Sequence, residues 1–146
     1  MSTLTHFYSY ATGVSLELPV GFQCVEEGES VASYAALDDA DAVGPDTPAL
    51  QVRVVAAVPD DDPEGSAALA RLADQLAASG SLLGRVDRIV DECPVTTVEV
   101  ERDGTYLHLS AAAADGRLIS IAGRSTARDD FAIWDAALES MRFITL

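Results

Sequence analysis

Histidine is the side chain best suited to acid–base or metal chemistry near neutral pH, and this chain has two. We expect His6 to lie in a frayed N-terminal segment. His108 lies in an alternating segment, on the same predicted face as Tyr106 and Ser110. There is no H-x-x-x-H pair and no Cys/His spacing typical of zinc sites. The favoured interpretation is a half-exposed strand residue, and the alternative is a catalytic or ligand-binding face at Tyr106 and His108.

Glu99 and Glu101 are a pair of carboxylates with a spacing that could suggest catalysis. They share one face of a predicted strand, with their Cα atoms about 7 Å apart. A glycosidase could use such a separation. Alternating glutamates on a solvent-exposed strand face are far commoner, so we favour that interpretation.

The acidic loops could in principle hold a cation. The segment from Asp39 and Asp41 to Gly44 weakly resembles a calcium loop, with glycine at the sixth position. Position five is Val43, and position twelve is Leu50, where a bidentate glutamate is needed. The adjacent Asp60, Asp61 and Asp62 have diverging side chains. We therefore expect solvated loops and no metal site.

Nucleophiles and nucleotide-binding motifs are also missing from the sequence. No G-x-S-x-G motif is present, so Ser110, Ser120 or Ser125 would each need an unsupported triad. Cys24 and Cys93 form no CxxC motif and are typical of small apolar fillers in reduced form. The glycines form neither G-x-G-x-x-G nor a P-loop. We expect no cofactor and no enzymatic activity.

Composition narrows the class of protein. The 146 residues fit a single domain, 1–146, with 49% hydrophobic content. The net charge is −15, and it is uneven: residues 1–70 hold twelve acids and one arginine, and residues 71–146 hold twelve acids and eight arginines. Such a surface repels nucleic acid and anionic membranes. The absence of lysine suggests a GC-rich genome, such as that of an actinobacterium. No signal segment or membrane span is visible, which predicts a cytoplasmic protein.

Hydrophobic periodicity predicts strands over residues 14–18, 30–37, 50–58, 85–91, 96–102, 105–113 and 117–123. Asp103-Gly104 and Asp115-Gly116 predict two hairpin turns, and hence a three-stranded meander. Val55 and Ala57 suggest that both faces of the 50–58 strand are covered. The final residues, Arg142–Ile144, would pack back on the sheet.

Two amphipathic helices are predicted. The first starts at Asp62-Pro63, buries Leu69, Leu72, Ala73 and Leu76, and ends at Ser79-Gly80 with a left-handed glycine. The second is capped by Ser125 or Thr126 and presents one apolar stripe of Phe131, Trp134, Leu138 and Met141. We interpret that stripe as core.

The order of these elements resembles the PsbP-like superfamily, which includes LpqN-type lipoproteins and Eag-type chaperones. The matching residues are Ser15, Leu16, Leu18, Pro19, Gly21 and Phe22 near the start, and Ser140, Arg142 and Phe143 near the end. The resemblance implies an α+β fold, with an antiparallel β-sheet of about six strands and two main helices packed on it as an α/β/α sandwich. It also implies a module that works by contact rather than by catalysis.

These observations predict a non-catalytic protein-binding or escort module, like an adaptor or chaperone, of the bacterial cytoplasm. Its partner would be a protein with a basic or apolar segment attracted by the acidic first half. The alternative is a small-molecule-binding protein or enzyme with a pocket on the Tyr106/His108 sheet face. A homodimer through the edge of the meander is a third hypothesis.

Overall fold

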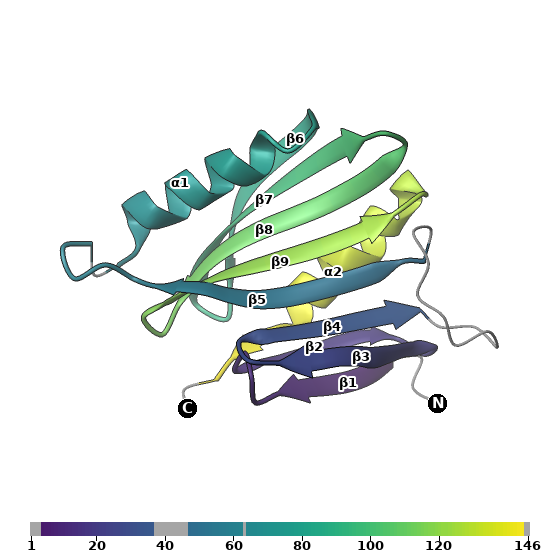
Figure 1. Ribbon diagram of the computed structural model, residues 1–146, viewed down its shortest axis with the longest axis horizontal. Helices are drawn as coiled ribbons and strands as arrows, with labels where there is room; N and C mark the ends of the chain where they lie inside the picture. Colours follow the sequence, from purple (N-terminus) through teal and green to yellow (C-terminus); the bar gives the residue numbers. More distant parts are fainter. Residues whose placement is uncertain (1–3, 37–46, 63, 145–146) are drawn as a thin grey trace.

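The computed structural model describes residues 4–36, 47–62 and 64–144, which form two antiparallel sheets and two α-helices (Figure 1). The smaller sheet has the order β1-β2-β10, with β1 (Leu4–Ser9), β2 (Val14–Pro19) and β10 (Arg142–Phe143). The larger sheet has the order β3-β4-β5-β9-β8-β7-β6. Its strands are β3 (Phe22–Gly28), β4 (Val31–Ala36), β5 (Ala49–Ala57), β6 (Ser81–Val90), β7 (Cys93–Arg102), β8 (Thr105–Ala114) and β9 (Arg117–Ser125). The α+β class is confirmed, but the expected single sheet of about six strands is wrong.

The predicted meander is confirmed as β7-β8-β9, and its turns form for the expected reason. Asp103 and Gly104 have φ of 53° and 81°, and Asp115 and Gly116 have φ of 51° and 72°. Two successive positive values match the twist of the flanking strands. A third such turn, at Asp91 and Glu92 with φ of 50° and 66°, joins β6 to β7.

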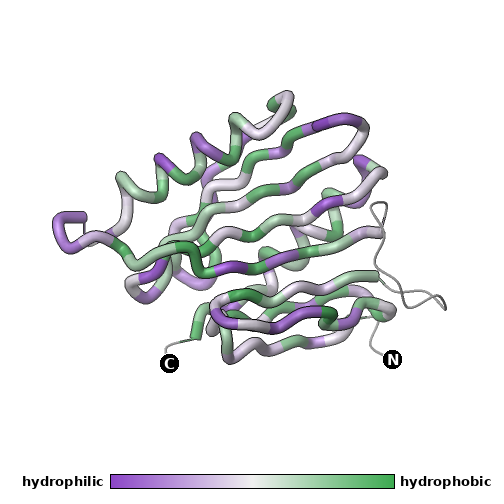
Figure 2. Tube along the Cα trace, viewed as in Figure 1, coloured by the Kyte–Doolittle hydropathy of each residue, from purple (hydrophilic) through white to green (hydrophobic). Residues whose placement is uncertain are grey.

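The strands that sequence patterning missed are β1 and β3, and β5 is covered less than expected. His6 is not frayed, because β1 pairs with β2 and places His6 opposite Glu17. In β3 only Phe22 is buried, so the strand shows no apolar alternation. Figure 2 shows the hydrophilic residues that prevail along β3 and its turn into β4. Val55 and Ala57 of β5 are both exposed, so covering of both faces is wrong.

Helix α1 (Ser66–Ala77) packs on β7 and β8. Asp62 acts as its cap, because its Oδ2 accepts hydrogen bonds at 3.0 Å from the backbone N–H of both Ala67 and Ala68. The helix nevertheless begins at Ser66, and Pro63 lies outside the described residues. The expected left-handed Gly80 is wrong. Glycine is needed there because an added Cβ would lie 2.6 Å from the Glu101 carbonyl oxygen.

Helix α2 (Phe131–Ser140) follows a short 3₁₀ turn, η1 (Arg128–Asp130). The expected cap at Ser125 or Thr126 is wrong, because Ser125 is the last residue of β9. Its hydroxyl donates to the Asp130 carboxylate and accepts from the Ala127 N–H, which ties strand to turn. The apolar stripe of α2 is buried as predicted: Phe131, Trp134, Leu138 and Met141 are all at most 7% exposed.

The helices lie on opposite faces of the seven-stranded sheet. Ala111 of β8 packs with Leu69 and Ala73 of α1, and the next residue, Ala112, belongs to the main core with α2. Side chains alternate between the faces of a strand. Helix α2 also packs against β2, so one core joins both sheets. Its centre is Trp134, 1% exposed, with its ring centroid 5.9 Å from that of Phe22.

The contact between Trp134 and Gly123 of β9 gives a test of this packing. A Cβ added at Gly123 would lie 2.6 Å from Trp134 Cγ. Because buried backbone and indole cannot both move aside, we expect Gly123→Ala to lower the free energy of unfolding by about 1–3 kcal/mol. Gly28→Ala is the matched control, since its Cβ would make an ordinary 3.6 Å contact with Val31. Urea unfolding that shows equal stability for the two variants would contradict this packing.

Candidate functional site

The Tyr106/His108 face of the seven-stranded sheet is covered by α2. His108 is 1% exposed, and its ring centroid lies 5.8 Å from that of Phe131. Tyr106 meets the same Phe131 ring edge-on at 6.0 Å. His108 is therefore not the half-exposed residue that we predicted. Helix α2 lies over the face on which the alternative hypothesis placed a pocket.

His108 makes a polar link between β8 and α2. Its Nε2 lies 2.6 Å from Asp135 Oδ1, and Arg88 of β6 lies 3.3 Å from the same oxygen. The imidazole donates this hydrogen bond, since an ionised carboxylate only accepts. Burial lowers the pKa of His108, and the hydrogen bond to Asp135 opposes this only partly. The imidazole is thus held neutral at neutral pH, as a structural group rather than an accessible base.

Glu99 lies next to this pair, and the three residues are a candidate cation site. One ligand atom each from Glu99, His108 and Asp135 lies within 4.8 Å of the others. Carboxylate oxygen and imidazole nitrogen are ligands for divalent metals. The Arg88 guanidinium beside Asp135 opposes a second positive charge there. Sequence patterning missed this cluster because Asp135 comes from a helix 27 residues further along the chain. Glu101, the other half of the predicted pair, pairs with Tyr106 at the strand end.

The remaining candidates from the sequence do not come together. Asp39, Asp41, Val43 and Gly44 of the calcium-like segment lie outside the described residues, while Leu50 is buried in β5. Ser110 is buried against Thr97, with 2.8 Å between the two hydroxyl oxygens. Ser120 and Ser125 lie in β9.

Cys24 and Cys93 are both free, and they lie in different strands. Partial burial of the sulfur raises the pKa of each thiol. Each is therefore kept in the less reactive thiol form.

A cavity lies on the other face of the sheet, the face that carries α1. Helix α1 packs mainly on β7 and β8, and the surface over β3, β4, β5 and β9 holds a groove of about 430 Å³. The small side chains of Ala49 and Ala122 leave its floor low. We call this the sheet groove. It is lined by Val25, Glu26, Ser33, Tyr34, Ala49, Leu50, Gln51, Leu107, Ala122, Gly123 and Arg124.

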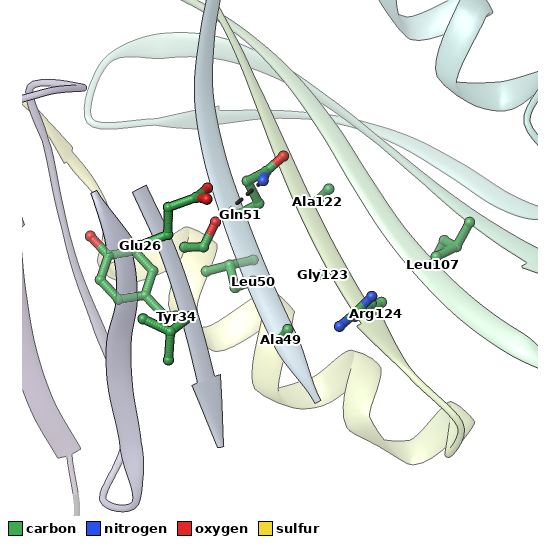
Figure 3. A pocket seen from close by; sticks show the side chains of 11 residues that line it. Glu26, Tyr34, Ala49, Leu50, Gln51, Leu107, Ala122, Gly123 and Arg124 are labelled. Carbon is green, nitrogen blue, oxygen red and sulfur yellow. Dashed lines mark hydrogen bonds between the residues drawn. The ribbon is translucent and has the colours of Figure 1, made fainter. Parts of the chain in front are cut away.

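The sheet groove combines apolar surface with a few polar groups. Figure 3 shows the Glu26 carboxylate pointing toward Gln51, with Arg124 further along the same face. Gln51 Nε2 donates to Ser33 Oγ at 3.2 Å, which fixes the amide across two strands. Such a mixture is typical of binding surfaces, where apolar area supplies affinity and placed polar groups supply orientation.

The second cavity, of about 390 Å³, lies between α1 and the edge strand β6. Ser66, Leu69 and Ala70 line it from the helix, and Arg85, Asp87 and Ile89 from the strand. Arg85 pairs with Asp74 of α1 at 2.9 Å, and Asp87 accepts a hydrogen bond from Thr96 at 2.7 Å. The charged groups here are thus already held by the protein.

The architecture defines an α+β domain with helices on both faces of an antiparallel sheet and an open groove on one of them. Within the described ranges, no helix is long and apolar enough to cross a membrane. No protein-family model and no curated protein matches the chain. Solved structures do match, at low identity.

One such structure is cyanobacterial PsbP, CyanoP, from Synechocystis sp. PCC 6803. It is 17% identical with a TM-score of 0.62, over 98% of this chain and 94% of that one. A putative regulator of unknown function, PA94 from Pseudomonas aeruginosa, is 16% identical with a TM-score of 0.57, over 95% and 96%. A protein from Bacteroides thetaiotaomicron is 13% identical with a TM-score of 0.60, over 99% of this chain and 50% of that one. The chain therefore has the PsbP-like fold.

The buried His108 gives a testable pH dependence. Because its pKa is lower in the folded state, the unfolded chain binds more protons once the pH falls below about 6.5. Its contribution to stability is present above that pH and is lost as the pH falls through the folded-state pKa. His108→Gln keeps a donor for Asp135 but does not titrate. We expect its free energy of unfolding to fall less than that of the wild type between about pH 8 and pH 5.

Urea titrations at several pH values would measure this effect. His6→Gln, in β1, controls for the loss of an imidazole elsewhere in the chain. An unchanged pH dependence in His108→Gln would show that His108 is protonated equally in the folded and unfolded states.

Proposed function

We propose that the protein is a non-catalytic binding module that holds a segment of a protein partner in the sheet groove. The observation that carries this proposal is the position of the groove, on the part of the sheet that α1 leaves uncovered. Residues of five strands line the groove, and a surface that crosses several strands suits an extended segment. An adaptor or escort protein needs a surface that binds its partner, and it does not need a catalytic side chain.

The charge next to the groove favours a basic partner segment. Glu26 lines the groove, and Glu27 and Glu29 follow it, all three exposed. Val25, 40% exposed, offers apolar contact beside them. The whole chain carries a net charge of −15, which would steer a basic segment toward it. We therefore propose an extended segment that carries arginine or lysine among apolar residues.

The chemistry of the groove supports binding rather than catalysis. Its lining includes no histidine and no cysteine, and its charged groups are Glu26 and Arg124. His108, the residue best suited to general base catalysis, faces the opposite side of the sheet beneath α2. A placed acid or base in contact with substrate is the usual requirement for hydrolysis or group transfer.

We further propose that the protein works in the cytoplasm of a bacterium, within the actinobacteria. The free thiol of the exposed Cys24 suits a reducing compartment. The use of arginine as the only basic residue supports the source. The second candidate function is small-molecule binding in the same groove, because about 430 Å³ lies within the range of ligand pockets.

Charge reversal at Glu26 tests the proposal. Glu26→Arg should weaken capture of the partner about tenfold or more, because it replaces the attraction for a basic segment by repulsion. Glu64→Arg is the matched control: it makes the same change of charge at an exposed position before α1, away from the groove. Wild type and both variants would serve in parallel as bait at low salt, and each captured protein would be quantified.

A protein that is captured by the wild type and by Glu64→Arg but not by Glu26→Arg supports the proposal. Equal capture by all three baits contradicts it. Thermal stabilisation by metabolites in the wild type, together with no protein lost from Glu26→Arg, would favour the small-molecule alternative.

A further inference from the structure

Strand β6 is an edge of the seven-stranded sheet, and it carries more apolar surface than an edge strand should. Among the described strands, it pairs with β7 alone. Leu82, Val86 and Ile89 are 52%, 47% and 70% exposed, and they account for three of the nine large hydrophobic residues exposed in the described part of the chain. A long edge strand with exposed apolar side chains is a template for pairing with another strand.

The backbone of β6 also offers a regular row of groups at its free edge. The two-residue turn at Asp91 and Glu92 closes with the pair Val90 and Cys93. In such a hairpin the closing pair is hydrogen-bonded, and bonded pairs then alternate along the ladder. Counting back from Val90, the N–H and C=O groups of Arg85, Asp87 and Ile89 point away from β7, toward the free edge.

We propose that β6 pairs antiparallel with β6 of a second copy of this chain, about a two-fold axis at Val86. In this register Arg85 of each copy lies opposite Asp87 of the other, so two cross-strand pairs of opposite charge form. Opposed charges on neighbouring strands stabilise an antiparallel pair, and like charges destabilise it. Arg85 and Asp87 are also residues whose backbone groups point outward, so each pair can exchange two backbone hydrogen bonds.

Other registers of the β6–β6 pair near this one would place like charges opposite each other. A two-fold axis normal to the sheet keeps each side chain on its own face, so a residue must lie at the axis opposite itself. An axis at Arg85 or Arg88 would oppose two guanidinium groups, and an axis at Asp87 would oppose two carboxylates. Among these four positions, only Val86 puts an uncharged residue on the axis and opposite charges beside it.

The side chains near the axis are already arranged for this contact. Arg85 is held by Asp74 and Asp87 by Thr96, so little side-chain entropy is lost when they meet the second copy. Further from the axis, Ile89 of one copy lies opposite the β-bulge between Leu82 and Gly84 of the other copy. It therefore comes next to the exposed Leu82 of that copy. Helix α1 packs mainly on β7 and β8 and reaches β6 through the Arg85–Asp74 ion pair, and no described strand pairs with the outer edge of β6.

Charge-swapped variants test the proposal. We expect the wild-type protein to sediment as a dimer at about 0.15 M salt, where the net charges of the two copies are largely screened. Arg85→Asp and Asp87→Arg should each weaken dimerisation about tenfold or more, because each places two pairs of like charge opposite one another. The double variant, which carries both substitutions, restores opposite pairs and should recover the dimer.

Substitution at the axis gives an independent test with a matched control. Val86→Lys places two ammonium groups face to face and should yield a monomer. Val25→Lys makes the same change at an exposed valine of β3, the opposite edge of the sheet, and should leave the dimer intact. Circular dichroism would show that each monomeric variant is folded. A wild-type monomer up to about 1 mM, or a dimer that resists Val86→Lys and both single charge reversals, would overturn the proposal.

Discussion

The position of α2 determines which parts of this molecule are core and which are surface, and a single contact fixes it. Trp134 lies directly over Gly123, at a distance that leaves no room for a side chain on β9. With the indole seated there, α2 contacts β2 of the smaller sheet and also β8 of the larger one. One core then spans both sheets, and the face that carries His108 is closed. The groove on the opposite face lies beside α1, which packs mainly on β7 and β8.

Sequence patterning predicted the elements that are specified by residues close together in the chain. Asp-Gly pairs at 103–104 and 115–116 specify their turns through backbone preference alone, and the stripe from Phe131 to Met141 needs only helical periodicity. Strand β3 could not be predicted this way, because it is exposed apart from Phe22 and has no alternation to detect. The burial of His108 was missed for a different reason: it depends on Asp135 and Phe131, which belong to a helix far along the chain.

The sheet groove was beyond prediction from the sequence for the same kind of reason. Its lining comes from five strands, and what makes it a groove is the absence of a helix above them. Periodicity finds the apolar face of each strand but not the element that covers it. The charge was visible from the start as an acidic first half, and the structure places Glu26 and its acidic neighbours where that charge borders an open surface.

The two edges of the seven-stranded sheet are built in opposite ways, and this difference bears on how binding and self-association could coexist. Strand β3 and its turn carry Glu26, Glu27 and Glu29 with no basic residue, a pattern that repels another copy of the same strand. Strand β6 instead carries Arg85, Asp87 and Arg88, within a chain whose net charge is −15. The charges of the β3 edge therefore oppose its pairing with a second copy, whereas those of β6 are the self-complementary set on which the proposed pairing rests. Because the groove borders β3 and the pairing edge lies at the other end of the strand order, two copies joined through β6 would each keep an open groove.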